Sequence, residues 1–199
     1  MQLLERGAPL AALAEYAHEA RLGGGRLVLV AGEAGIGKSA LVEQLQADLP
    51  DARWSWGACD GLFTPRPLGP LFDLAGQAGG ELDELCRAGA AREDLFRALL
   101  RQVSEPGTLS VVVVEDVHWA DEATVDLLRF LGRRLRHAPV LLIATYRGKT
   151  WRRMTRCGLR WGRSPGSGRP GGWTFRRCRR MRCGSWPAGP VSTRPSCTG

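Results

Sequence analysis

The sequence Gly32-Glu33-Ala34-Gly35-Ile36-Gly37-Lys38-Ser39 decides the fold, because it fits the pattern G-x-x-x-x-G-K-[ST] in full. It follows a continuous apolar run at residues 27–31, which is short enough to be a buried strand of a parallel sheet. It opens a segment of helical character that extends to about residue 49 and stops at Pro50. Glycines allow the backbone to curl so that successive N–H groups point inward, and the N-terminus of the helix adds positive charge. The stretch therefore predicts a phosphate-binding loop between a strand and a helix.

Two side chains of this loop have expected parts in binding ATP. Lys38 can reach the β- and γ-phosphates as a mobile positive charge, and the hydroxyl of Ser39 can ligate magnesium. The backbone of all eight residues, Gly32 to Ser39, is expected to contact the nucleotide. We therefore expect ATP and Mg²⁺ as cofactors, bound at a Walker A loop.

A second apolar run, at residues 109–114, ends in the acidic pair Glu115 and Asp116. In open α/β sheets the carboxyl ends of the strands are where ligands bind. One carboxylate can hold magnesium through water, and its neighbour can orient or deprotonate the attacking water. We assign Glu115 to the metal and Asp116 to the water, with the reverse assignment left open. The pair could also do no more than cap the next turn.

A third polar strand end is expected at Thr145-Tyr146-Arg147, after the apolar run at residues 140–145. It should emerge at the same edge of the sheet as the acidic pair. Arg147 can there contact the γ-phosphate and respond to its loss, so it joins Lys38 and Asp116 as a candidate catalytic residue. The alternative is an arginine that is merely solvated.

Helical and strand patterns alternate over the first three-quarters of the chain. Strands separated by helices imply a parallel sheet with helices on both faces, an α/β fold of the P-loop NTPase class. The expected strands are residues 26–31, 53–58, 109–114 and 140–145. The expected helices are residues 9–22, 38–49, 71–77, 92–104 and 121–136.

The charge of the chain divides sharply after Arg147. Residues 1–147 hold 15 Lys and Arg against all 20 Asp and Glu, whereas residues 148–199 hold 13 basic residues and no acidic one. The second part contains two residues of the Leu, Ile and Val types, against twelve Arg, ten Gly and five Pro. Such a segment buries too little apolar surface to offset roughly 1–2 kcal/mol of backbone entropy per residue. We expect a partial ATPase domain at 1–147 and a basic, disordered tail at 148–199.

The composition of the tail is typical of a GC-rich gene that is read out of frame. When each last codon base is joined to the first two bases of the next codon, Gly148 to Trp161 can read Glu-Asp-Leu-Ala-Ala-Asp-Asp-Pro-Leu-Arg-Leu-Ala-Leu-Gly. This looks like ordinary globular sequence, so we interpret the tail as a frameshifted translation. The alternatives are a nucleic-acid arm built on Arg176-Arg177 and Arg179-Arg180, or incidental sticking of the basic tail to nucleic acid.

With these elements in place, residues 1–147 resemble the AAA-type ATPase module of large LuxR-family transcriptional regulators, the MalT-like signal-transduction ATPases. Similar modules occur in Orc1-like ATPases. Besides the Gly32–Ser39 loop, the matching pieces are Leu3-Leu4-Glu5-Arg6, Gly57-Ala58-Cys59-Asp60, Glu115-Asp116-Val117-His118-Trp119-Ala120-Asp121 and Thr145-Tyr146-Arg147.

The resemblance implies a switch in which ATP binding and hydrolysis favour different domain arrangements, and DNA is read only through a C-terminal domain absent from this chain. It also implies that the last strand and the helical lid over the nucleotide are missing after Arg147, which would make the chain a fragment. The strand at 27–31 would then be an exposed apolar edge, and ATP turnover would be weak. The alternative functions are an Orc1-like DNA-handling ATPase and a P-loop small-molecule kinase.

No stretch approaches the ~18 apolar residues of a membrane span, and the N-terminus does not look like an export signal. The six cysteines form no C-x-x-C pair. We expect reduced thiols, no membrane partner and a cytoplasmic protein.

Overall fold

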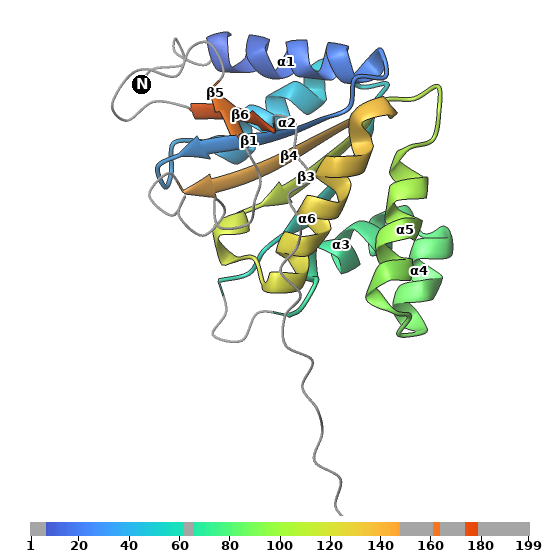
Figure 1. The fold of residues 1–199 in the computed structure, drawn as a ribbon. Helices are drawn as coiled ribbons and strands as arrows, with labels where there is room; N and C mark the ends of the chain where they lie inside the picture. The colour runs from blue at the N-terminus through green and yellow to red at the C-terminus, as the bar shows by residue number, and fades with distance from the viewer. Residues whose placement is uncertain (1–6, 62–65, 148–160, 164–173, 179–199) are drawn as a thin grey trace, which may run out of the picture.

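The computed structural model describes residues 7–61 and 66–147, together with short strands at 161–163 and 174–178. Four strands run parallel in the order β2-β3-β4-β1 (Figure 1). They are β1 (Arg26–Gly32), β2 (Arg53–Ala58), β3 (Ser110–Glu115) and β4 (Val140–Arg147). The four parallel strands that the apolar runs predict are thereby confirmed.

Helices cover both faces of this sheet, which explains why the central strands are apolar along their whole length. On one face α1 (Gly7–Arg21) and α2 (Lys38–Asp48) pack on alternate side chains of the strands, such as Val28, Val111 and Ile143. On the other face lie α3 (Gly69–Ala78), α4 (Gly80–Arg87), α5 (Arg92–Val103) and α6 (Glu122–Arg134), which form the larger core. The α/β, P-loop NTPase fold is the one expected.

The helix α4 has no counterpart among the expected helices. Its eight residues bury one side chain fully, Leu82, and its first turn carries Glu81 and Asp83. The segment is only eight residues long, and Gly79 and Gly80, which precede and open it, both have positive φ and interrupt the pattern. The helix is stabilised mainly by its packing on α3 and α5, since a helix this short is not stable in isolation.

The edge of β1 differs from the expectation. The strand β6 (Thr174–Cys178) pairs antiparallel with β1 over Val28–Ala31, and β5 (Trp161–Arg163) pairs antiparallel with β6. Disorder was therefore the wrong expectation for these two short segments, and β1 is not an exposed edge. The composition argument considered only side-chain burial, whereas an unpaired parallel strand offers a row of backbone N–H and C=O groups that any extended segment can satisfy. The remaining residues of 148–199, and any lid they could form, lie outside the described residues.

The opposite edge, β2, is covered by side chains of α3. The Gln77 amide accepts from the Trp56 N–H at 2.9 Å and donates to the Trp56 carbonyl at 2.5 Å, while Asp73 accepts from the Ala58 N–H at 3.1 Å. Gly57 permits this contact, because a Cβ at this position would lie 2.6 Å from the Pro70 carbonyl oxygen. The carboxyl end of β2 is thereby fixed beside that of β3.

Within the described parts of the chain, no helix has the length and apolar character needed to cross a membrane.

Candidate functional site

The loop between β1 and α2 has the conformation that its glycines predict. Gly35 and Gly37 adopt left-handed φ values of 75° and 90°, a region that side-chain-bearing residues rarely enter. Gly37 is the N-cap of α2, and it has no side chain to occupy the first N–H groups of the helix. These donors, with the positive end of the helix dipole behind them, form a surface suited to a phosphate.

The side chain of Lys38 lies across this loop. Its ammonium donates to the carbonyl oxygens of Glu33 at 3.1 Å and Gly32 at 3.4 Å. Both acceptors are neutral, so a phosphate oxygen would be the stronger partner for the charge. The Lys38 ammonium therefore lies over the loop that is expected to bind the phosphates.

Ser39 and Glu115, which are 76 residues apart in sequence, are in direct contact. The Ser39 hydroxyl donates to Glu115 Oε1 at 2.5 Å, joining the first turn of α2 to the carboxyl end of β3. A hydroxyl and a carboxylate are hard oxygen donors of the kind that Mg²⁺ prefers. Among the described residues no group of three or more His, Cys, Asp and Glu side chains could hold a metal ion alone. Ser39 and Glu115 would hold a magnesium ion only together with oxygen ligands from outside the chain.

Asp116 has an unusual backbone, with a left-handed φ of 52°. Its N–H donates to the hydroxyl of Thr145 at 3.0 Å, and Thr145 is buried at the end of β4. The expectation for that strand end concerned the phosphate, whereas the structure shows that Thr145 holds the backbone of Asp116. A local motif does not reveal this contact, because Thr145 and Asp116 lie at the ends of two different strands. The one indication in the sequence was that Thr145 is a polar residue at the end of an apolar strand.

His118 was not expected to belong to the site, yet its ring lies beside Asp116. Its Nδ1 is 3.6 Å from Asp116 Oδ1, its side chain is 5% exposed, and neither ring nitrogen has a hydrogen-bond partner. Burial lowers the pKa of the imidazole below its ordinary value, the Asp116 carboxylate opposes this, and the positive charges of Arg147 and Lys38 add to the lowering. His118 is thus a buried ring beside Asp116, and its burial favours the neutral form.

Arg147 ends β4 at the same edge of the sheet as the loop. In the register of the two strands Arg147 is opposite Gly32, and its side chain is exposed. The structure therefore brings together the loop residues, Glu115, Asp116 and Arg147, as the sequence predicts, and adds Thr145 and His118.

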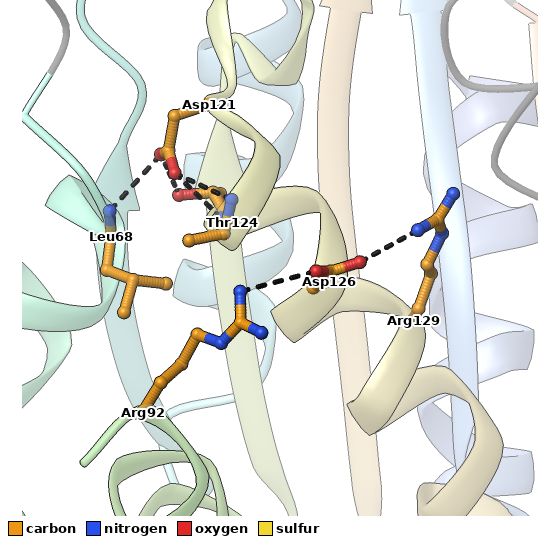
Figure 2. A network of polar contacts seen from close by, with 7 residues as sticks. Leu68, Arg92, Asp121, Thr124, Asp126 and Arg129 are labelled. Carbon is orange, nitrogen blue, oxygen red and sulfur yellow. Dashed lines mark hydrogen bonds and ion pairs between the residues drawn. The ribbon is translucent and has the colours of Figure 1, made fainter. Parts of the chain in front are cut away.

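Trp119 and Asp121, which follow the acidic pair, have structural roles. Asp121 caps α6 by accepting from the N–H groups of Ala123 and Thr124 at 2.9 and 3.1 Å, and it also accepts from the Leu68 N–H at 3.2 Å and from the Thr124 hydroxyl (Figure 2). Trp119 is half-exposed and packs on Gly61, where a Cβ would come within 3.0 Å of the indole ring.

Cys59 is buried next to these carboxylates. Burial, reinforced by Asp121 and Asp116, raises the pKa of the thiol to about 12. The thiol is therefore protonated at neutral pH, which makes it a packing group rather than a nucleophile or a metal ligand.

Comparison with known families gives one match that covers most of the chain. The family model described as AAA ATPase domain matches residues 2–143. Among curated proteins, an uncharacterized protein of Rhizobium meliloti (strain 1021) is 31% identical over 170 residues. That alignment covers 63% of this chain and 16% of the relative, so the chain spans a small part of the relative's length.

Two solved structures are similar to this chain at low sequence identity. Cdc6p from Pyrobaculum aerophilum has a TM-score of 0.56 and 16% identity, over 78% of this chain and 44% of that one. The Drosophila ORC bound to DNA has a TM-score of 0.45 and 12% identity, over 77% of this chain and 89% of that one. At 16% identity the similarity to Cdc6p shows the fold alone.

Proposed function

The chain belongs to the AAA ATPase domain family, and from this premise we propose that it binds ATP with magnesium and hydrolyses it. The observation that carries the proposal is the contact between Ser39 and Glu115. It joins the phosphate-binding loop to the acidic strand end, so the two halves of a nucleotide site meet at one point.

In this proposal the eight residues Gly32 to Ser39 bind the phosphates. The N–H groups of the loop and of the first turn of α2 donate to phosphate oxygens, and Lys38 exchanges its two carbonyl acceptors for the β- and γ-phosphates. The Ser39 hydroxyl and the Glu115 carboxylate hold the magnesium ion, which when bound neutralises charge on the phosphates. The contact with Ser39 favours Glu115 over Asp116 as the metal residue.

Asp116 is then left to orient or deprotonate the attacking water. Thr145 fixes its backbone, and the buried His118 ring packs beside its carboxylate on the protein side. Arg147 is the residue we propose to contact the γ-phosphate. Water attacks the γ-phosphorus, the bond from that phosphorus to the β–γ bridging oxygen breaks, ADP leaves with the bridging oxygen, and the proton of the water goes to Asp116.

Titration of the purified chain with ATP, followed by calorimetry in Mg²⁺ and in EDTA, tests binding. Lys38→Ala is expected to abolish measurable binding, and Ser39→Ala to remove the Mg²⁺ dependence while weak binding remains. Asp116→Asn is expected to bind ATP and lose turnover, measured as released phosphate. Arg53→Ala, at an exposed ion pair on β2, is the control and should match the unmodified protein. Binding that survives Lys38→Ala would sink the proposal.

As a biological role we propose the nucleotide switch of a LuxR-like transcriptional regulator, acting in the cytoplasm where ATP is abundant. The support is the sequence resemblance through the run His118 to Asp121. A DNA-handling ATPase of the Orc1-like type is an equal candidate on the fold. Turnover measured with and without duplex DNA, beside assays for phosphate transfer to metabolites, separates these roles from a kinase.

We also propose that residues from about 148 are translated out of frame, and that the module with its output domain continues in the shifted frame. The support is the basic composition and the readable shifted sequence. Sequencing of the gene decides this, since early stop codons in the shifted frame would contradict it.

A further inference from the structure

A groove of about 630 Å³ runs between α5 and α6, on the helical layer that covers one face of the sheet. Each of its two walls carries three arginines. The α5 wall has Arg92, Arg97 and Arg101, and the α6 wall has Arg129, Arg133 and Arg134.

The floor of the groove is aromatic, and its rings are already covered. Phe96 and Phe130 pack with ring centroids 5.5 Å apart, and Phe96 is 5% exposed. The guanidinium of Arg134 lies over the Phe130 ring at 3.9 Å. Phe96 is buried and Arg134 covers one face of Phe130, so the floor gives the groove an apolar base with little aromatic surface on which a nucleic-acid base could stack.

The arginines are concentrated here against the charge of the surrounding domain. The groove holds six of the 15 basic residues of residues 1–147, and with the flanking Glu81 and Asp94 it holds four of the 20 acidic ones. The rest of that region has almost twice as many acidic as basic residues. A basic groove on an acidic domain is a local feature that overall composition does not explain.

Most of the ion pairs within the groove are exposed to solvent, although the Arg129 side chain is only 25% exposed. Asp126 is shared by Arg92 at 3.4 Å and Arg129 at 2.7 Å (Figure 2), so one carboxylate serves two guanidinium groups. Arg101 pairs with Glu81 while its side chain remains 58% exposed. Pairs of this type contribute about 0–1 kcal/mol each, so carboxylates of a ligand can replace them at little cost.

We propose that this groove binds an acidic polypeptide segment of a partner protein, with carboxylates facing both arginine rows and an apolar side chain toward the floor. A groove between two packed helices, with arginines on both walls, suits a single peptide chain lying between them. Charge complementarity selects the acidic partner, and the covered rings disfavour single-stranded nucleic acid. The α6 wall begins one residue after Asp121, next to the nucleotide site, but the proposal does not depend on ATP binding.

The test compares two double variants of the full chain with a fluorescein-labelled 16-residue peptide of Glu with Leu at every fourth position. Arg92→Gln with Arg101→Gln removes two exposed ion pairs in the groove. Arg21→Gln with Arg53→Gln removes two exposed ion pairs elsewhere and is the matched control. Both variants keep residues 148–199, so any binding there is equal in the two.

Fluorescence anisotropy is expected to show about three- to tenfold weaker peptide binding for the groove variant and less than about twofold for the control. Hydrogen exchange should slow in α5 and α6 when the peptide binds. Equal losses in the two variants, or the absence of binding at millimolar peptide, would overturn the proposal. It is also overturned if a dT20 oligonucleotide, and not the peptide, depends on the groove arginines.

Discussion

At the residue scale, the site contains two kinds of side chain: those that face the proposed nucleotide and those that hold them in place. Asp116 belongs to the first kind, and Thr145 and His118 belong to the second. The Thr145 hydroxyl accepts from the N–H of Asp116, whose backbone is left-handed, and the His118 ring lies beside the Asp116 carboxylate. A non-glycine residue with positive φ costs of order 1 kcal/mol, and such strain persists where neighbours over-determine it. Here the neighbours are Thr145 and His118, whose burial holds Asp116 in this conformation.

His118 should make stability depend on pH. A histidine whose pKa is lower in the folded protein than its ordinary 6.5 binds a proton more readily when unfolded. The stability it contributes is therefore fully present above the unfolded pKa and is lost as pH falls below it. We expect the urea midpoint to fall between pH 7.5 and 5.5, and to fall less in His118→Phe.

The control for this prediction is His137→Gln, which removes an exposed histidine after α6. The comparison uses slopes rather than absolute midpoints, so a general loss of stability in His118→Phe does not confuse it. An unchanged slope in His118→Phe would show that the buried ring does not titrate with folding.

At the element scale, one carboxylate positions two helices. Asp121 caps α6 through Ala123 and Thr124 and ties the chain before α3 through Leu68, which itself has a left-handed φ of 58°. Asp121→Ala removes the cap and the tie together, and we expect a loss of about 1–3 kcal/mol in unfolding free energy. Asp121→Asn keeps the acceptor oxygen and should lose less; equal losses in urea melts would argue against the hydrogen bonds as the cause.

The contact between β2 and α3 gives a second element-scale prediction. Gly57→Ala places a Cβ against the backbone of Pro70, which cannot move as a side-chain end could, and we expect a loss of about 1–3 kcal/mol. Gly76→Ala is the matched control, since its Cβ meets nothing and it lies within α3. It should be neutral or stabilising by roughly 0.5–1 kcal/mol. Chemical denaturation of both variants checks the pair.

The elements that the sequence predicts correctly are those with strong local signals. The apolar runs at 27–31 and 109–114 could hardly be anything but buried strands, and the loop motif fixes where α2 begins. What could not be predicted is non-local: the pairing of β6 with β1, the hold of Thr145 on Asp116, and the tie from Asp121 to Leu68. In each case a backbone group is satisfied by a residue far away in sequence, and no periodicity records such a partner.

At the scale of the whole molecule, the sheet has no bare edge on β1 or β2, although the two are covered differently. On β2 the side chains of Asp73 and Gln77 take the backbone groups, whereas on β1 another strand pairs along Val28–Ala31. The β2 cover belongs to a helix with its own core contacts, in α3. The β1 cover comes from beyond Arg147, where acidic residues are absent and apolar ones are few.

This asymmetry predicts what removal of the last part of the chain should do. A chain ending at residue 147 would lack β6. The apolar residues Val28–Ala31 of β1 would then have no strand paired on the side away from β4. Such an edge is a template for pairing with another copy, so we expect residues 1–147 to self-associate while the full chain does so less. Size-exclusion chromatography with light scattering, at matched concentration and in 0.5 M salt to suppress charge effects, measures the difference. If residues 1–147 remain monomeric, pairing by β6 is not what protects β1, and the strand's own burial between α1, α2 and β4 is sufficient.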